Sequence, residues 1–515
     1  MSSQKYFLTT AIDYIQARPH LGHALEKIGA DALARFKRLT GHDVFFLTGT
    51  DEHSLNIQRQ AQKDGITPQV FCDRMVEQWI EIWKRLDISY DRFIRTTAKD
   101  HEKAVQVLFE KMKAGNHIYE GVYEGWYCPS CENFIAEKEL VDGKCAIHQI
   151  APERVKEKNY FLRLTTFQKP LLDAIRTGKF QIEPEIRRNE IVSFIEQGLQ
   201  DVSVSRSSVS WGIPLSFDTT QTVWVWFDAL INYLSGVGYA NNDVECAKWW
   251  PADVHIIGKD ITRFHCVIWP AMLIAAGIPL PKKVFAHGFI SVEGQKMSKT
   301  RGTVVEPDQV LEKYSTDVLR YFLLREVPFN GDGDFSWSRL EQRYNADLAN
   351  DLGNLINRTL SMIKRYREGV IPQSMSSDPL DDEVRSLAKS TVEKFRAHMD
   401  MCEFKPALEQ VWAFITRCNQ YVEQTAPWAL AKDPAKAERL SSVLYTLAES
   451  CRIISILIIP VMPKTAEKIR AQLGLVQSGL SFAEAEGWGR LKVGNRLSEV
   501  TPLFPRVAPN PQKTA

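Results

Sequence analysis

The chain has 515 residues, of which 44% are hydrophobic, and its formal net charge is +1. This length predicts two to four domains with sizeable cores. The near-neutral charge excludes a basic field over the whole molecule, so any contact with nucleic acid must be local. No segment reaches the ~20 uninterrupted apolar residues of a membrane helix, and no apolar leader opens the chain. Nine cysteines, only three of them clustered, exclude a disulfide framework. We expect a cytoplasmic protein with no membrane partner.

The first residues predict an α/β unit. A strand near residues 6–11 precedes a helix near 21–39, in which apolar side chains recur at helical spacing and after which Gly41 is a cap. A second strand, Val44 to Leu47, is followed by polar residues that include Asp51. Open α/β sheets bind ligands just beyond the carboxyl ends of their strands. Asp51 could receive a substrate ammonium, or it could cap a helix that begins near Ser54; the spacing leaves both open.

Pro19-His20-Leu21-Gly22-His23 lies at the turn from the first strand into the first helix. Backbone N–H groups at a helix N-terminus, together with two imidazoles, favour a polyphosphate. Taken alone, His20 and His23 would be ordinary residues of a first helical turn.

The pattern changes between about residues 117 and 212, where short strands and a charged stretch interrupt the α/β alternation. The range contains two C-x-x-[CH] pairs with metal-ligand spacing, formed by Cys128, Cys131, Cys145 and His148. Two such pairs supply the four ligands of a tetrahedral zinc ion, and chance clustering of thiols is the weaker alternative. With all four positions filled by protein, we expect one structural Zn²⁺ per chain in an inserted domain.

The α/β pattern returns at Val223–Phe227 and again at Val254–Ile257. Trp224, Trp226, Phe227 and Tyr233 form an aromatic cluster at a predicted strand-to-helix junction, and core packing explains at least some of them. From about Ser338 onward the sequence is almost wholly helical. A turn at Ala426-Pro427-Trp428 interrupts it, and Trp428 could either plug the bundle or present its ring to a partner.

Lys296-Met297-Ser298-Lys299-Thr300 places two lysines three residues apart on a short loop, with a hydroxyl on either side of Lys299. Charged loops are usually solvated surface. Mobile ammonium groups with neighbouring hydroxyls also suit a pyrophosphate that gains charge as it leaves. The presence of the histidine motif earlier in the chain favours this second interpretation.

The two motifs, in this order and about 270 residues apart, resemble the HIGH and KMSKS signatures of class I aminoacyl-tRNA synthetases. From about Tyr6 to about Val507 the chain resembles the methionyl-tRNA synthetases within that class. Further segments that carry the resemblance are Ala11–Tyr14, Gly49–His53, the cysteine pairs, Glu157–Phe161, Val204–Arg206, Trp211–Pro214, Trp224–Leu230, Ile257–Asp260, Asn350–Arg358 and Ala426–Trp428.

The resemblance implies an α/β fold: a Rossmann-like catalytic domain with a parallel sheet, split by the zinc-binding insert and followed by an all-α anticodon-binding bundle. The expected bounds are 1–116 and 213–280 for the two catalytic halves, 117–212 for the insert, 281–340 for the KMSKS-loop stem-contact region and 341–515 for the anticodon-binding domain.

The resemblance also implies the activity: ATP-dependent activation of L-methionine to methionyl-adenylate, with Mg²⁺, and transfer of methionine to tRNA(Met) for initiation and elongation. Asp51 would take the methionine ammonium, with Arg206 buttressing Asp51. The thioether would be enclosed by Ile12, Tyr14, Trp226, Ala229, Leu230, Tyr233, Ile261 and His265.

Three further sets of residues follow from the same resemblance. ATP would be bound by His20, Gly22, His23, Gly258, Asp260, His287, Gly288, Lys296 and Lys299, of which His20, His23, Lys296 and Lys299 would be catalytic. Asn354, Arg358 and Trp428 would read the CAU anticodon, Trp428 by stacking.

The chain departs from the family pattern at a few positions. Asp13 stands where proline or an uncharged residue is frequent, Thr300 replaces serine, and Gly302-Thr303 replaces a frequent Gly-Asn. A C-terminal dimerisation domain is not seen after Phe504, so we expect a monomer. Two other functions stay open on the residues alone: a different HxGH-type nucleotidyltransferase, and a tRNA-binding scaffold with decayed catalysis.

Overall fold

The computed structural model describes residues 4–130, 132–135, 137, 140–146, 149–297, 303–475 and 479–505. These residues form two compact units. One contains Lys5–Pro19 and Val44–His287, and we call it the sheet unit. The other contains His20–Asp43 and the residues from Gly288 onward, and we call it the helical unit.

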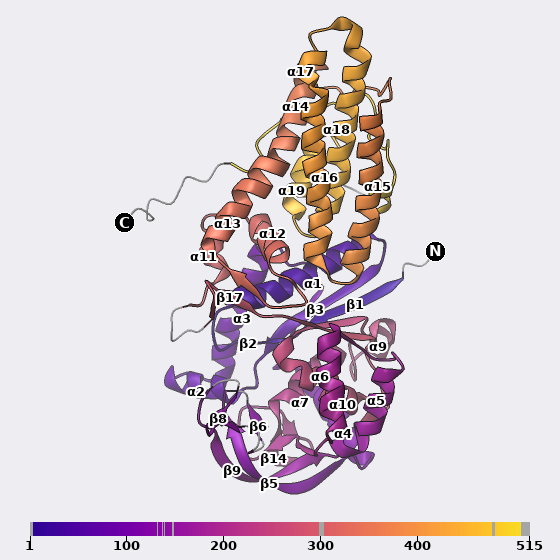
Figure 1. Ribbon diagram of the computed structural model, residues 1–515. Helices are drawn as coiled ribbons and strands as arrows, with labels where there is room; N and C mark the ends of the chain where they lie inside the picture. The colour runs from indigo at the N-terminus through magenta and orange to yellow at the C-terminus, as the bar shows by residue number, and fades with distance from the viewer. Residues whose placement is uncertain are drawn as a thin grey trace. The chain divides into compact units, whose positions relative to one another are not determined.

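A parallel sheet is the centre of the sheet unit (Figure 1). Its strands run in the order β10 (Gln181–Glu183), β16 (Lys283–His287), β15 (Val254–Gly258), β1 (Lys5–Thr10) and β3 (Asp43–Asp51), with β2 (Asp13–Tyr14) and β4 (Arg92–Arg95) both paired to β3. The pairs β1–β15, β15–β16, β16–β10, β3–β2 and β3–β4 are parallel. The predicted parallel sheet is confirmed. Because its strands are apolar on both faces, the sheet is buried between helices.

Three smaller antiparallel elements interrupt this pattern. A sheet of β11 (Val202–Ser203), β9 (Glu153–Leu162), β5 (Ile118–Cys128) and β6 (Asn133–Ile135) lies within the predicted insert, as does the hairpin β7 (Leu140–Val141) and β8 (Lys144–Cys145). A third sheet joins β12 (Ser205–Arg206), β14 (Asp218–Val223) and β13 (Pro214–Leu215). The range 117–212 is not wholly separate, because β10 returns to the edge of the main sheet.

The helices of the sheet unit are α2 (Leu55–Lys63), α3 (Pro68–Arg85), α4 (Lys99–Ala114), α5 (Gln168–Arg176), α6 (Glu185–Glu196), α7 (Val225–Leu230), α8 (Asn232–Ser235), α9 (Asp243–Trp249) and α10 (Trp269–Ala275). A π-helical turn, Phe264–Ile268, leads into α10. The predicted strand-to-helix junction is found where β14 ends at Val223 and α7 begins at Val225. Trp224 and Phe227 lie in the buried core, while Trp226 is only partly buried.

In the helical unit, α1 (Leu21–Leu39) packs against the C-terminal helices. The Phe36 ring lies 6.2 Å from that of Phe395 and 5.5 Å from that of Phe482. A Cβ at Gly29 would come within 2.4 Å of the Phe329 ring, so only glycine allows this close approach. The fully buried guanidinium of Arg320 donates to Asp31 at 2.6 Å, which places a paired charge in the core.

The bundle of the helical unit consists of α14 (Asn354–Tyr366), α15 (Pro379–Asp400), α16 (Phe404–Thr425) and α18 (Ala437–Leu457), which run side by side in Figure 1. Shorter helices are α11 (Pro307–Leu311), α12 (Thr316–Glu326), α13 (Trp337–Arg343), α17 (Pro427–Leu430), α19 (Pro463–Gln472) and α20 (Ala483–Glu486), and Tyr344–Gly353 is π-helical. The predicted helical domain is confirmed.

The helical stretch Pro434–Leu457 is long and apolar enough to cross a membrane by length and composition. However, 94% of its most apolar window is buried inside the protein. A helix that is buried on all sides is hydrophobic all round, so α18 is the core helix of the bundle.

Candidate active site

The two histidines of the first motif cap helix α1. His20 is the N-cap residue, and its Nδ1 accepts a hydrogen bond of 3.0 Å from the Gly22 N–H. The Nδ1 of His23 accepts in turn from the backbone N–H of His20, at 3.2 Å, and the two rings stack with their centroids 3.8 Å apart. An Nδ1 that accepts a backbone N–H carries no proton, so a neutral ring holds its proton on Nε2. Both imidazoles are therefore hydrogen-bond donors at Nε2, and phosphate oxygens are hydrogen-bond acceptors.

The first motif and the lysine loop come together within the helical unit. The Leu21 N–H donates to the Val305 carbonyl, at 3.0 Å. A Cβ at Gly22 would lie 2.8 Å from Cε1 of His20 and 3.3 Å from Cε of Met297, so a side chain there would displace the His20 ring. Lys296 is exposed at the end of β18 (Gln295–Lys296), which pairs with β17 (Ile290–Val292); β17 also pairs with β19 (Gly333–Phe335). Ser298, Lys299 and Thr300 lie outside the described residues.

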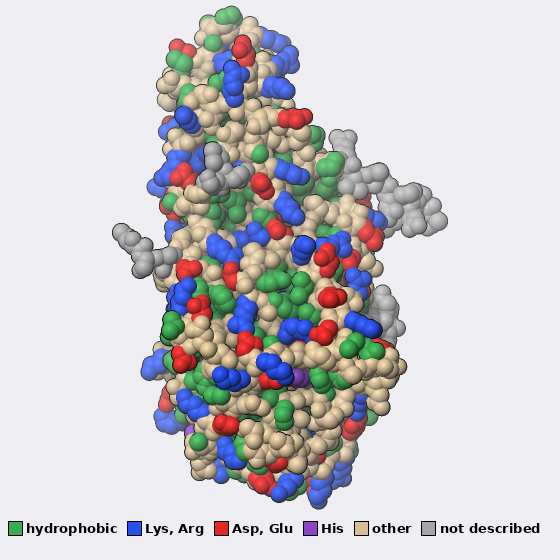
Figure 2. All heavy atoms as spheres, turned by 180° about the vertical axis from the view of Figure 1, so that it is seen from behind, with side chains coloured by type: hydrophobic (Ala, Val, Ile, Leu, Met, Phe, Trp, Pro, Cys, Tyr) green, Lys and Arg blue, Asp and Glu red, His purple; other side chains and the backbone are tan. Residues whose placement is uncertain are grey.

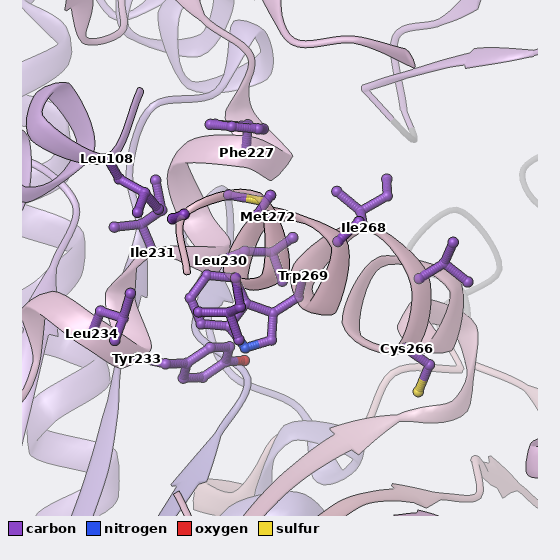
Figure 3. Close-up of a cluster of buried hydrophobic side chains, with 14 of the residues drawn as sticks. Leu108, Phe227, Leu230, Ile231, Tyr233, Leu234, Cys266, Ile268, Trp269 and Met272 are labelled. Atoms are coloured by element: carbon purple, nitrogen blue, oxygen red, sulfur yellow. The ribbon is translucent and has the colours of Figure 1, made fainter. Parts of the chain in front are cut away.

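Several residues of the predicted thioether pocket lie in an aromatic wall in the sheet unit. The Tyr14 ring meets Trp226 edge to face at 5.8 Å, and Trp226 stacks on Phe264 at 3.9 Å with 6° between the planes. Ile12, Tyr14, Trp226 and Ile261 are partly buried and pack against the main core cluster. In Figure 3, Leu230 and Tyr233 of the predicted pocket lie beside Trp269 in that cluster. Ala229 is also buried.

Tyr233 and His265 form a buried hydrogen-bonded pair at this wall. The Tyr233 Oη lies 2.7 Å from Nε2 of His265, and the His265 Nδ1 lies 3.0 Å from the Ile261 carbonyl oxygen. This network fixes the orientation of both rings. The structure therefore holds three of the predicted pocket residues in one arrangement.

Asp51 is the last residue of β3 and is 2% exposed. Ser54, not Asp51, caps α2, since the Ser54 Oγ accepts from the Asn56 N–H; the helix-cap interpretation of Asp51 is wrong. Among the described residues, the Asp51 Oδ1 and the Tyr14 hydroxyl are both buried without a hydrogen-bond partner. Burial raises the pKa of Asp51 well above its usual value, and the neighbouring Asp228 and Glu132 carboxylates add to this shift. A cation bound beside Asp51 would favour the ionised carboxylate and so offset the effects of burial and of the neighbouring carboxylates.

Arg206 has a carboxylate partner in Glu157. The Arg206 Nε and Nη2 donate to the two carboxylate oxygens of Glu157 at 3.0 and 3.1 Å. Its guanidinium also lies 4.1 Å from the centroid of the Tyr127 ring. The predicted action of Arg206 on Asp51 stays a prediction. Glu157 and the Tyr127 ring fix the orientation of the guanidinium.

Three residues predicted to contact ATP lie together at the carboxyl end of neighbouring strands. Gly258 ends β15 and pairs in register with His287 at the end of β16. A Cβ at Gly258 would lie 2.6 Å from Oδ1 of Asp260 and 3.9 Å from Nε2 of His287. At Gly288, a Cβ would lie 1.9 Å from the Gly331 carbonyl oxygen, so a side chain is excluded. Open α/β sheets bind nucleotides at this edge.

The three predicted anticodon readers lie on the helical unit. Asn354 and Arg358 are one turn apart on α14, so they share a face. The Arg358 guanidinium lies 5.7 Å from the centroid of the Trp428 ring and donates to Glu423 at 2.7 Å. Trp428 comes two residues after Ala426, which has a left-handed backbone conformation, and Trp428 is 40% exposed, so its ring does not plug the bundle.

The cysteine pairs are described in part. Cys128 ends β5 and Cys145 ends β8, and both thiols are buried in a small cluster with Ile135. Cys131 and His148 lie outside the described residues. Within the described ranges no group of three or more His, Cys, Asp or Glu side chains could hold a metal ion.

Comparison with known proteins decides the family. A model of the class I tRNA synthetases (M) matches residues 6–145 and 135–360, and a model of the anticodon-binding domain of methionyl-tRNA ligase matches residues 371–514. The chain is 49% identical to the methionine–tRNA ligase of Caldanaerobacter subterraneus subsp. tengcongensis and 45% identical to that of Clostridium tetani, over 98% of this chain and 79% of each relative. The chain belongs to the methionyl-tRNA synthetases.

A solved structure of the Mycobacterium tuberculosis methionyl-tRNA synthetase in complex with methionyl-adenylate has the same fold. It is 42% identical to this chain, with a TM-score of 0.95 over 98% of this chain and 100% of that chain.

Two aromatic rings that contact the predicted pocket residues of this synthetase are not indicated by any sequence pattern. Phe264 stacks on Trp226, and His255 stacks on Tyr233 at 4.2 Å. Burial lowers the pKa of His255 well below its usual value, with a smaller effect from His265, so His255 is a neutral ring. Glu157 pairs with Arg206. In the sequence, only the family resemblance of the segment Glu157–Phe161 pointed to Glu157.

Proposed function

We propose that the chain activates L-methionine with ATP to methionyl-adenylate and transfers methionine to tRNA(Met), with the following division of roles. The observation that carries the proposal is the buried carboxylate oxygen of Asp51, which has no hydrogen-bond partner among the described residues and lies beside the aromatic wall of Tyr14 and Trp226. A carboxylate binds the ammonium, and the rings suit a polarisable thioether. Methionine-dependent ATP–pyrophosphate exchange tests it.

Methionine is bound in the sheet unit. Its ammonium donates to Asp51 and to the Tyr14 hydroxyl, which are both buried without a hydrogen-bond partner among the described residues. Its side chain contacts Trp226, and the Tyr233–His265 pair closes the end of the pocket. Arg206, oriented by Glu157, buttresses Asp51.

The phosphates of ATP are bound by donors and cations. The Nε2–H groups of His20 and His23 donate to phosphate oxygens, and the α1 N-terminus adds its dipole. The methionine carboxylate attacks the α-phosphate in line, and pyrophosphate leaves with Lys296 and Lys299 beside it. Mg²⁺ bound with ATP neutralises part of the phosphate charge.

Gly258 and Asp260 contact the ribose, and His287 and Gly288 lie near the adenine.

The helical unit recognises the anticodon through Asn354, Arg358 and Trp428. Lys and Arg side chains are interspersed with Asp and Glu on the face shown in Figure 2. Binding therefore depends on a few specific contacts more than on a uniform basic surface. The same proposal includes a cytoplasmic location, a monomeric state and one structural Zn²⁺ held by Cys128, Cys131, Cys145 and His148.

Trp428→Ala is expected to weaken tRNA binding by about 1–3 kcal/mol, because an exposed aromatic ring that stacks on an unpaired base loses that contact. The kcat/KM for aminoacylation should fall by about tenfold or more, while pyrophosphate exchange without tRNA stays at the wild-type rate. Met401→Ala, at another exposed apolar position of the bundle, is the matched control. Equal aminoacylation by the Trp428 variant and the wild type would remove this ring from the tRNA site.

Cys145→Ser is expected to release the zinc ion, since serine is a poor zinc ligand and three ligands hold the ion weakly. Elemental analysis should find about one zinc per wild-type chain and almost none in the variant. Cys246→Ser, a half-buried cysteine outside the predicted site, should keep its metal. Wild-type protein purified without any zinc would overturn the assignment.

A further inference from the structure

A buried chain of hydrogen-bonded polar side chains lies in the sheet unit. The Asp228 carboxylate, fully buried, accepts from two imidazoles: Oδ2 lies 2.7 Å from Nδ1 of His53, and Oδ1 lies 2.7 Å from Nε2 of His101. The second nitrogen of His101, Nδ1, lies 2.7 Å from the Ser235 Oγ. Both oxygens of Asp228 are therefore occupied, and the carboxylate does not need a ligand to satisfy it.

The network joins the segments that carry the methionine-binding residues. His53 comes two residues after Asp51, at the end of β3. Asp228 lies on α7, two residues after Trp226, and Ser235 lies on α8, two residues after Tyr233. His101, in the first turn of α4, holds the other side of Asp228. One hydrogen-bonded chain thus fixes the ammonium acceptor relative to the pocket wall.

Asp228 also places a negative charge near Asp51. Burial alone would raise the pKa of Asp228, but the His53 and His101 imidazoles outweigh it and hold the pKa below its usual value. The pKa of Asp51 is shifted in the opposite direction: burial raises it most, and the charge of Asp228 raises it further. Two buried carboxylates close enough to interact favour a cation between or beside them.

We propose that Asp228, held by His53 and His101, is a positioning residue for methionine: it fixes the pocket wall against Asp51 and adds a second negative charge that attracts the ammonium. The inference rests on the proposed role of Asp51. The second negative charge acts on the ammonium and not on the carboxylate or the thioether. An amino-acid analogue without the α-amino group should therefore be indifferent to the charge of Asp228.

The test compares two non-hydrolysable acyl-sulfamoyl adenosines on the full chain. One carries the methionyl group, and the other carries its desamino counterpart, 4-(methylthio)butanoyl. The nucleoside half gives both compounds measurable affinity by calorimetry. Asp228→Asn should weaken the amino compound by about tenfold or more and change the desamino compound by less than about twofold. Asp51→Asn is the reference and should show the same preference more strongly.

Each outcome decides a separate point. Equal weakening of both compounds by Asp228→Asn would show a merely structural role and overturn the inference, as would no weakening of either. If Asp51→Asn also fails to distinguish the compounds, the proposed ammonium site is wrong; if it distinguishes them and Asp228→Asn does not, only the inference fails.

A second pair of variants covers the case in which Asp228→Asn does not fold. His101→Ala removes the donor to Asp228, whereas His101→Gln keeps an N–H in the place of Nε2. We expect the alanine variant to lose affinity for the amino compound alone and the glutamine variant to retain most of it. Identical behaviour of the two variants would contradict a role through that hydrogen bond.

Discussion

Replacing Lys299 by alanine is expected to lower kcat for methionine-dependent pyrophosphate exchange by about 10²–10³, the usual cost of removing one donor to charge that develops in the transition state. The KM for methionine should change little, because the lysine acts on the departing pyrophosphate and not on the bound amino acid. Steady-state exchange kinetics at saturating ATP give both constants.

Lys394→Ala is the matched control, since this exposed lysine lies on α15 of the bundle and is outside the predicted ATP-binding residues. It should leave exchange unchanged. A Lys299 variant with near-normal kcat would remove the loop from the chemistry, even though Met297 and Gly22 lie together in the structure.

Asp51→Asn is expected to lower kcat/KM for methionine by about 30-fold to several thousandfold, because truncating one partner of a buried charge pair costs about 2–5 kcal/mol. The KM for ATP should stay within about threefold of wild type, since the loss is confined to the amino-acid contact. Asp64→Asn changes an exposed carboxylate at the end of α2 and should have no effect. An Asp51 variant that keeps the wild-type kcat/KM would exclude Asp51 as the ammonium acceptor.

The pH dependence of methionine binding follows from the raised pKa of Asp51. An acid with a raised pKa holds its proton to higher pH, yet the ammonium requires the ionised carboxylate. The affinity for methionine should therefore be greatest where Asp51 is ionised, and should fall as pH drops through the Asp51 pKa, which lies above the usual range of a carboxyl group. The limit is about tenfold per pH unit for one proton. In Asp51→Asn this dependence should disappear; an unchanged profile would assign it to another group.

Local patterns in the sequence predict much of the fold. The helix over 21–39 can be predicted because Leu25, Ile28 and Phe36 recur at helical spacing, and the structure has it at Leu21–Leu39. The strand before Asp51 is equally clear from its apolar run. Both elements depend on contacts that are periodic along the chain, and such contacts leave a signal in the sequence.

The remaining features depend on contacts between distant residues. β10 has only three residues and joins the sheet through β16, a hundred residues later, so no local pattern distinguishes it from the insert. His20 as an N-cap is unexpected, because imidazoles are not among the usual capping side chains. The pairing of Asp228 with His53 and His101 joins three separate segments. The role of such residues becomes visible only from their hydrogen bonds in the structure.

The central claim, activation of methionine, is tested most directly by amino-acid-dependent ATP–pyrophosphate exchange with the purified chain, in the absence of tRNA. With each of the 20 amino acids supplied separately, methionine should support rapid exchange, and leucine, isoleucine and valine should support little, because none of them has a thioether to place against Trp226 and Tyr14. Exchange that needs no amino acid, that is fastest with an amino acid other than methionine, or that does not occur at all would contradict the account.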